Sequence, residues 1–282
     1  MPSATCACHL RTSDRSASVA APALLTWSDA AKHLARPSES TVRARMNIAH
    51  VPTIVATMHL RRVASHDIAR AVASMAFDRV PLSRTNGLRF WKLLGTGSGQ
   101  TFTPHDADPT TWGLFAVWDS VDAAKRFSAA SPVTQRWTTH AAEQWEALLV
   151  PLVWKGRWSR RDPFDGAVPG VPVPGRAVAA VTRARVKPSQ WRAFAAATPP
   201  VAAAVNGSPG LRYTVGIGEA PIGLQGTFSL WDSNDALRNF AYTNAEHRAV
   251  MTRTHTDRWY AEEMFARFTV LESSGTIAGR AL

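Results

Sequence analysis

Apolar and polar positions alternate along several short stretches of the chain, and between them apolar residues recur every three or four positions. Alternation is typical of a half-buried strand, whereas the longer spacing is typical of an amphipathic helix. In the first half the pattern predicts strands at residues 53–60, 88–94, 112–118 and 147–154, and helices at 67–77, 121–130 and 132–145. This is the order β-α-β-β-α-β, which a ferredoxin-like unit has.

The two halves of the chain repeat each other. Gly87-Leu-Arg-Phe90 matches Gly210-Leu-Arg-Tyr213, and residues 115–127 match residues 228–240 at a constant offset of 113. Trp-Asp-Ser occurs at 118–120 and again at 231–233, where Asp or Ser would cap the helix that follows a strand. The second copy of the long helix is expected at residues 245–262. Each half is therefore one copy of a unit of about 100 residues.

Two ferredoxin-like units in one chain can close their sheets into a single barrel, so we predict an α+β fold in which two tandem ferredoxin-like repeats form a pseudo-dimeric α/β barrel. The barrel interior is expected to form a pocket for a large apolar ligand, with Phe90, Phe115 and Phe228 on the strands that line it. The expected regions are a loosely ordered leader at 1–50, a first repeat at 51–160, a Pro/Gly-rich linker at 161–176, a second repeat at 177–272 and a tail at 273–282.

Charge narrows the choice of partners. The chain has 32 Lys and Arg against 21 Asp and Glu, for a formal net charge of +11. The excess is spread along the chain, and no basic run is longer than the pairs Arg61-Arg62 and Arg160-Arg161. This spread argues against nucleic acid. It leaves the carboxylates of a cofactor, an acidic protein or an anionic membrane surface as partners for the basic side chains.

Cysteine usage and hydropathy indicate the compartment. Cys6 and Cys8 are the only cysteines, which is too few for a disulfide framework or a Cys-rich metal site. No apolar run approaches the roughly 18 to 20 residues that cross a bilayer, and the first 26 residues lack the pattern of a signal peptide. A cytoplasmic protein is expected, with at most peripheral contact with a membrane.

Several segments resemble one enzyme family. These include Trp154-Lys-Gly-Arg-Trp158 and Gly216-Ile-Gly-Glu-Ala-Pro221, together with residues 90–104, 131–137, 163–164, 182–187 and 266–268. These segments resemble the spheroidene monooxygenases of carotenoid biosynthesis, and the resemblance runs in order along the chain from about residue 53 to residue 272. The leader of about 50 residues and the short tail depart from the family pattern.

The resemblance implies a haem-dependent, O2-dependent monooxygenase that introduces a keto group near the end of an acyclic carotenoid. It implies haem b as the cofactor and a ferredoxin-type protein as the electron donor. Composition and spacing alone leave other activities open. These are a haem-dependent dehydratase or a cofactor-independent monooxygenase acting on another apolar substrate, and a non-catalytic haem- or lipid-binding protein.

Haem iron needs an axial donor, usually a histidine nitrogen. Outside the leader and the loop at His105, the chain offers His59, His66, His140, His247 and His255. The resemblance favours His247 as the iron ligand, with His255 second and His140 as a structural residue. Arg248 and Arg253 flank His247 and are candidates to bind the haem propionates by charge-assisted hydrogen bonds.

Gly95-Thr-Gly-Ser-Gly99 is neither G-x-G-x-x-G nor a P-loop, and no helix is predicted after it, so it does not indicate nucleotide binding. We expect a tight turn between strands, which Gly216-Ile-Gly218 would repeat in the second half. Gln100 and Thr101 follow this turn and are candidates to line one mouth of the barrel and contact the cofactor or the substrate. No nucleophile triad and no metal motif such as H-E-x-x-H occurs, so hydrolytic chemistry is disfavoured.

Overall fold

The computed structural model describes residues 54–101, 104–219, 226–243, 250, 252–254 and 256–282. The chain divides into two units, residues 1–47 and 48–282, and every described residue belongs to the second. The leader predicted at residues 1–50 therefore lies outside the described residues. Within the described residues, no helix is both long and apolar enough to span a membrane.

The first repeat has the predicted order of elements. Its strands are β1 (Val55–Val63), β2 (Leu88–Gly97), β3 (Ala107–Trp118) and β4 (Ala141–Gly156). Its α-helices are α3 (Ile68–Phe77), α4 (Arg79–Ser83), α5 (Val121–Ala130) and α6 (Pro132–His140), with short 3-10 turns η1 (Ser65–Asp67) and η2 (Pro104–Asp106).

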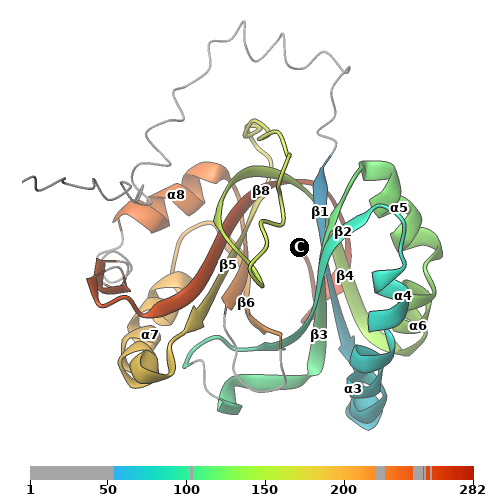
Figure 1. Ribbon diagram of the computed structural model, residues 1–282, viewed down its shortest axis with the longest axis horizontal. Coiled ribbons are helices and arrows are strands. Elements are labelled where there is room, and N and C mark those ends of the chain that lie inside the picture. Colours follow the sequence, from blue (N-terminus) through green and yellow to red (C-terminus); the bar gives the residue numbers. More distant parts are fainter. Residues whose placement is uncertain (1–53, 102–103, 220–225, 244–249, 251, 255) are drawn as a thin grey trace, which may run out of the picture. The chain divides into compact units, whose positions relative to one another are not determined.

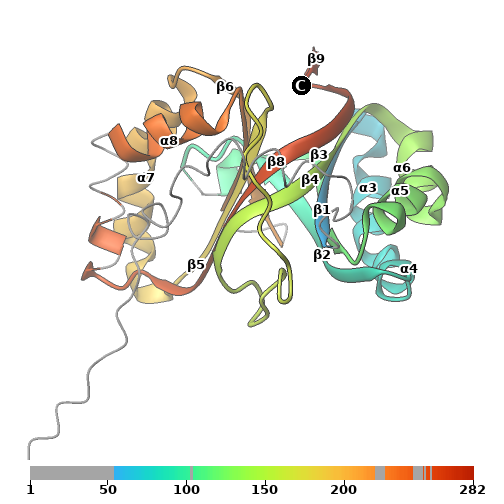
Figure 2. The same cartoon turned by 90° about the horizontal axis from the view of Figure 1, so that it is seen from above.

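The second repeat follows the same plan. Its strands are β5 (Val178–Val186), β6 (Leu211–Gly218), β7 (Gly226–Trp231) and β8 (Tyr260–Ile277), followed by the short β9 (Arg280–Ala281). Its helices are α7 (Trp191–Asn206) and α8 (Asn234–Thr243), and a 3-10 turn, η3 (Pro188–Gln190), precedes α7. Figures 1 and 2 show that α7 and α8 lie on one side of the strands, whereas α3 to α6 lie on the other.

Two seams join the repeats into a closed barrel. The strand order is β4-β1-β3-β2-β6-β7-β5-β8, and β4 also pairs with β8, which closes the circle. The β4–β8 seam is long, since it runs from the pair Trp145–Gly275 to the pair Gly156–Met264. The β2–β6 seam is short and contains three residue pairs. The prediction of an α+β barrel built from two ferredoxin-like repeats is therefore confirmed.

The short seam explains the glycine-rich run that begins at Gly95. Instead of the expected tight turn, Gly95 and Gly97 lie at the end of β2 and pair with Gly218 and Gly216 of β6. A Cβ on Gly216 would approach the Cα of Gly99 to 2.9 Å. The backbones of the two repeats approach so closely here that a side chain would separate them, and this accounts for the glycines.

Side-chain caps begin helices α5 and α6 of the first repeat, and one predicted helix end is wrong. Ser120 accepts a hydrogen bond from the backbone N–H of Ala123 and so begins α5, as its position after β3 predicts. Ser131 accepts one from the N–H of Val133, and Pro132 occupies the first turn of α6. We predicted that this helix runs to residue 145, but it ends at His140 because the alternating residues after it pair with β1.

The second repeat departs from prediction near the end of the chain. The helix predicted to run to residue 262 stops earlier, because β8 begins at Tyr260. The same strand continues to Ile277, beyond residue 272 where we expected the repeat to end, and the Ile277 side chain is buried in the core. The sequence pattern hid this extension, since the strand is largely exposed from Glu272 to Thr276.

Candidate active site

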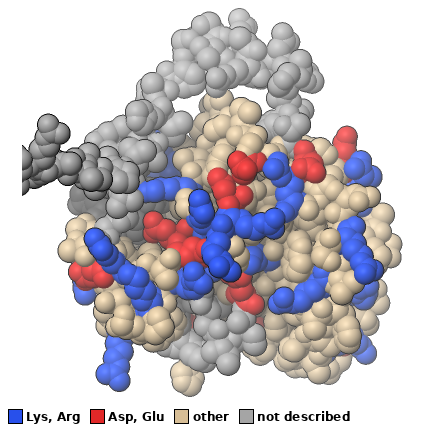
Figure 3. Space-filling view, in the orientation of Figure 1, with Lys and Arg blue, Asp and Glu red and all other residues tan. Residues whose placement is uncertain are grey.

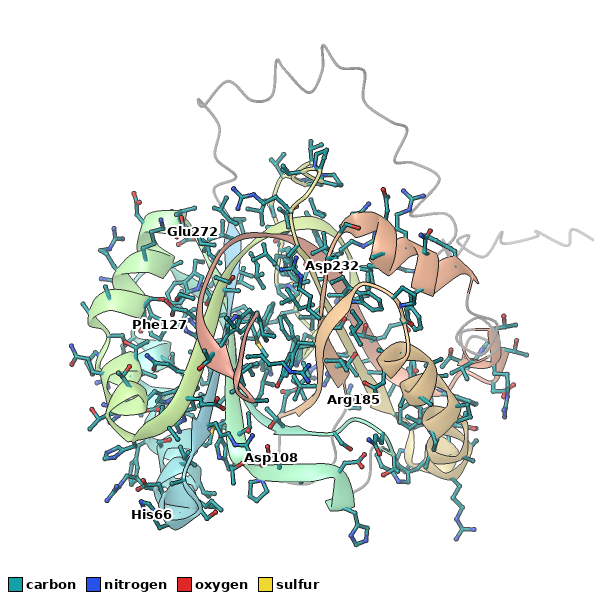
Figure 4. The ribbon with its side chains drawn as sticks, turned by 180° about the vertical axis from the view of Figure 1, so that it is seen from behind. His66, Asp108, Phe127, Arg185, Asp232 and Glu272 are labelled. Atoms are coloured by element: carbon teal, nitrogen blue, oxygen red, sulfur yellow. The ribbon has the colours of Figure 1, made fainter. Side chains whose placement is uncertain are left out.

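The inside of the barrel is filled with aromatic side chains. Phe115 stacks on Trp158 with a ring-centroid distance of 5.6 Å, and Phe164 packs against Phe268 at 5.6 Å. Trp158 and Phe164 come from the segment between β4 and β5 and are fully buried. Figure 4 shows side chains throughout this space. We expected a pocket here. In the described part of the chain the connecting segment fills the barrel instead.

A charged network closes one end of the barrel. Glu219 Oε1 accepts hydrogen bonds from Trp158 Nε1 at 2.6 Å and from Arg183 at 2.9 Å, and its Oε2 pairs with Lys92 Nζ at 2.5 Å. Glu262 pairs with Arg183 and accepts the backbone N–H of Ser159 at 3.0 Å. Burial disfavours ionisation of Glu219, but the hydrogen bonds from Lys92 and Trp158 and the positive charges outweigh it and lower its pKa.

Lys92, Trp158, Arg183 and Glu219 come from four of the segments that carry the family resemblance. All four carboxylate oxygens of Glu219 and Glu262 accept a hydrogen bond. Ser159 and Arg160 have positive φ angles of 54° and 63°, a costly conformation that directs their N–H groups to Glu262. The network therefore holds the connecting segment in the barrel. With both carboxylates held in ion pairs, it is a structural cluster and not an acid–base pair.

The outer face of the second repeat is different, because the middle of strands β5, β6 and β7 carries only small residues there. Neighbours such as Ala179 and Val181 point into the barrel, so alternate residues of the strands face the helices. We call these the small-residue floor: Ala180, Thr182 and Ala184 of β5, Gly216 of β6, and Thr227 and Ser229 of β7. Thr182 is exposed although β5 is a central strand.

Apolar packing on this face is divided into two clusters on either side of the floor. One cluster joins Val186, Phe194 and Trp259, with Val250 packed against them. The other joins Val178 and Ala180 to Trp231 and Leu237. Protein interiors rarely leave a central strand position without side-chain cover. The floor at Thr182 is therefore the open surface that a flat ligand could cover.

The loop that contains two predicted site residues borders the floor. Gly99 lies against Gly216 and near the methyl group of Thr227. Gln100 is exposed, and the N–H of Thr101 donates to Asp106 Oδ2 at 2.6 Å. Asp106, which sequence reasoning missed, also accepts the Ser98 hydroxyl at 2.9 Å and so shapes the loop. The contact of Gln100 and Thr101 with a cofactor stays a prediction.

The predicted iron ligand lies outside the described residues. His247, Arg248 and His255 all fall in the gaps of the second repeat. Arg253 is described: its side chain is exposed, its guanidinium lies 5.1 Å from the centre of the Trp259 ring, and Nε is 3.8 Å from Asp257 Oδ2. Nε1 of Trp259 is buried and has no hydrogen-bond partner among the described residues. Arg253 thus lies beside a cluster that flanks the floor.

The equivalent face of the first repeat carries a histidine, but this histidine is already engaged. His59 is 6% exposed, with Nδ1 3.1 Å from Glu146 and Nε2 3.1 Å from the hydroxyl of Thr57. A hollow of about 550 Å³ lies beside it under α5, with Lys125 at its edge. Because both ring nitrogens have partners, His59 offers no free nitrogen to an iron. His140 lies 3.3 Å from Arg70, at the surface.

Comparisons with known proteins agree with this architecture. No family model matches the chain. The chain is 33% identical over 209 residues to the spheroidene monooxygenase of Rhodobacter capsulatus. The matched residues make up 74% of this chain and 86% of that protein. It is 33% identical over 219 residues to the spheroidene monooxygenase of Rubrivivax gelatinosus, with coverages of 76% and 83%.

Among solved structures, a crystal structure of aldoxime dehydratase covers 77% of this chain and 81% of its own, with a TM-score of 0.50 and 10% identity. At this identity the likeness shows a shared fold and nothing about activity. The sequence identity over most of both chains shows more. The chain belongs to the spheroidene monooxygenase family, and it is an oxygenase.

Proposed function

We propose that the protein is a haem b-dependent monooxygenase that introduces a keto group into an acyclic carotenoid such as spheroidene. The relatives bear the name of this substrate. The proposal includes O2 as the oxidant and a ferredoxin-type protein as the electron donor. The observation that carries the cofactor assignment is the small-residue floor, with Thr182 exposed at its centre.

The residues present fit a planar macrocycle. A haem needs a flat surface on one side and apolar walls at its edges. Ala180, Ala184 and Gly216 are buried and small, so the floor has no protruding side chain. The clusters around Trp231 and Trp259 lie on either side of it. A haem over Thr182 would cover the residue of the floor that the surrounding chain leaves exposed.

Residues of both repeats would hold the group. His247 would ligate the iron, and Arg248 and Arg253 would bind the propionates. Arg253 is suited to this role, because its exposed guanidinium is held beside Trp259 by a cation–π contact and only weakly by Asp257. Gln100 and Thr101 border the floor through Gly99 and would contact the cofactor or the substrate. Bound haem supplies the activation of O2 that no side chain provides.

The overall reaction balances as two oxygenations of one CH2 group. Each inserts one oxygen atom of O2 into a C–H bond and reduces the other to water, and so uses two electrons from the donor and two protons. The resulting gem-diol loses water and leaves the ketone. The part of this chain is to fix the end of the polyene, to exclude water and to bind the propionates.

The purified protein tests the proposal directly. We expect a Soret band, and turnover of an acyclic carotenoid with O2 and reduced ferredoxin to a product with one oxygen more and two hydrogens fewer. His247→Ala should lose the Soret band, whereas His255→Ala should retain it.

Three results would count against the proposal. A protein without a Soret band that still oxidises the carotenoid is a cofactor-independent monooxygenase. A protein with haem but no turnover is a carrier. Normal haem content in His247→Ala moves the ligand to another residue.

A further inference from the structure

Helices α3 and α4 present apolar side chains to solvent. Val72 is 49% exposed, Phe77 74% and Val80 54%. Only five large hydrophobic side chains are exposed in the described part of the chain, and these three lie within nine residues. Ala69, Ala73 and Ala76 are also exposed, which gives α3 a continuous apolar stripe at a spacing of three to four residues.

The fold does not account for this stripe. The opposite side of α3 already packs on the barrel, where Ala71 and Met75 contact Val63 and Trp112. Arg61 of β1 fixes the helix by donating a hydrogen bond to Ser74. With its inner side packed, α3 needs no apolar outer side for stability. Exposed apolar patches that the core does not explain commonly mark interaction surfaces.

Basic residues surround the stripe, and the nearby acids are neutralised. Arg70, Arg79 and Arg84 are all exposed. Asp67 forms an ion pair with Arg70 at 2.7 Å, and Asp78 is completely buried. Figure 3 shows mostly uncharged surface over the corner where α3 lies, with basic side chains at its margin.

A basic hollow adjoins this surface. It has a volume of about 480 Å³ and is lined by Arg79, Arg89 and Arg161, with Trp91 among its walls. The hollow is large enough for a phosphate with its ester groups, and its arginines match the geometry of phosphate oxygens.

We propose that the α3–α4 face, defined as Val72, Phe77 and Val80 with Arg70, Arg79 and Arg84, docks on an anionic lipid bilayer. Apolar side chains ringed by arginines are complementary to acyl chains below a layer of anionic headgroups. A second copy of the same face is a poorer partner, since an isologous contact would bring its arginines together. The proposal does not depend on the haem.

Vesicle co-sedimentation of the full chain tests the proposal. We expect binding to vesicles of equal parts phosphatidylcholine and phosphatidylglycerol, and much weaker binding to phosphatidylcholine alone. Phe77→Asp should weaken binding about tenfold, because it removes a large apolar side chain from the bilayer. Arg79→Gln and Arg84→Gln should each weaken binding about fivefold, and only on the anionic vesicles.

Val168→Asp is the matched control, because Val168 is 68% exposed but lies between the repeats. It should bind like the unmodified protein, and circular dichroism should show all variants folded. Equal binding of Phe77→Asp and the unmodified protein would overturn the proposal, as would equal binding to both kinds of vesicle. A dimer in sedimentation velocity that Phe77→Asp dissociates, without vesicle binding, assigns the face to a second copy instead.

Discussion

The outer faces of the two repeats share one backbone plan and differ in what they carry. At the same registers, the first repeat has a row of Leu93, Leu114, His59 and Glu146, and the second has Gly216, Thr227, Thr182 and Phe265. In the first repeat Leu93, Leu114 and His59 are at most 7% exposed, whereas Thr182 is exposed. Along this row the second copy is open at Thr182, whereas the first is packed at Leu93, Leu114 and His59 and has its hollow of about 550 Å³ at the end of the row, between Glu146 and α5.

Helices cover apolar clusters on both faces. Under α5 and α6 one cluster extends from Val55 and Leu114 to Phe127 and Trp137, and a second, with Val63, Ala71 and Trp112, lies under α3. Under α7 and α8 the cover is split into two clusters. After a duplication, one copy can supply stability while the other keeps space for a ligand, since full packing and an open site cannot occupy the same face.

The largest expected effect is a loss of stability on removing Arg61, the buried arginine on the outer face of the first repeat. Arg61 is 3% exposed, and its guanidinium lies 4.1 Å above the ring of Trp137; burial lowers its pKa to about 10. Arg61→Ala should cost about 3 kcal/mol of unfolding free energy by urea denaturation, because it leaves a cavity and unpaired polar groups. Haem content of the folded fraction should not change. Arg62→Ala, at an exposed neighbour, should stay within about 0.5 kcal/mol.

Leu114 and Thr227 occupy the same place in the two rows. Giving either position the residue type of the other should change stability by an intermediate amount. Leu114 is 1% exposed, so Leu114→Thr should destabilise the protein by about 2 kcal/mol. The reverse change, Thr227→Leu, should stabilise the haem-free protein by about 1 kcal/mol and lower its haem content. Equal losses of stability in the two variants would mean that both faces are packed alike, and the comparison would fail.

The smallest expected effect is on the pH dependence of folding stability, to which Glu146 contributes. The hydrogen bond from His59 lowers the pKa of Glu146 below its ordinary value of 4.5, although burial opposes this. A carboxylate with a lowered pKa stabilises the fold above its ordinary pKa, and this contribution is lost as the pH falls through the lowered value. Because Glu146 is 42% exposed, the contribution is less than about 1 kcal/mol.

Glu146→Gln removes this pH-dependent contribution. The loss of unfolding free energy between neutral pH and about pH 3 should be slightly smaller in the variant than in the unmodified protein. Chemical denaturation at the two pH values measures it. If the variant and the unmodified protein lose the same free energy of unfolding between these two pH values, the contact with His59 contributes nothing to stability.

Much of the fold could be predicted because the same sequence pattern occurs in both halves of the chain. The match of residues 115–127 to 228–240 identifies a strand, a cap and a helix in both halves. Alternation then supplies the remaining strands, and pairing two open sheets requires a barrel. Local signals such as the cap at Ser120 also sufficed, because they depend on neighbouring residues only.

Features that depend on contacts distant in sequence escaped prediction. Proline and glycine around residues 163–175 indicate an irregular segment, but nothing local shows that Trp158 and Phe164 fill the barrel. The role of the glycines after Leu94 depends on a seam with β6 that only the closed barrel creates. The small-residue floor needs the registers of three strands, and single residues such as Thr182 carry no signal of it.

The haem content of Thr182→Trp shows whether the small-residue floor binds haem. Tryptophan at this position would stand on the floor between the two apolar clusters and exclude a flat ligand. Arg185→Trp is the control, because it places the same side chain at an exposed position on the opposite face of β5. With haem measured by the pyridine haemochrome method, we expect little haem in Thr182→Trp and full occupancy in Arg185→Trp. Full occupancy in both folded variants would mean that haem does not bind on the floor.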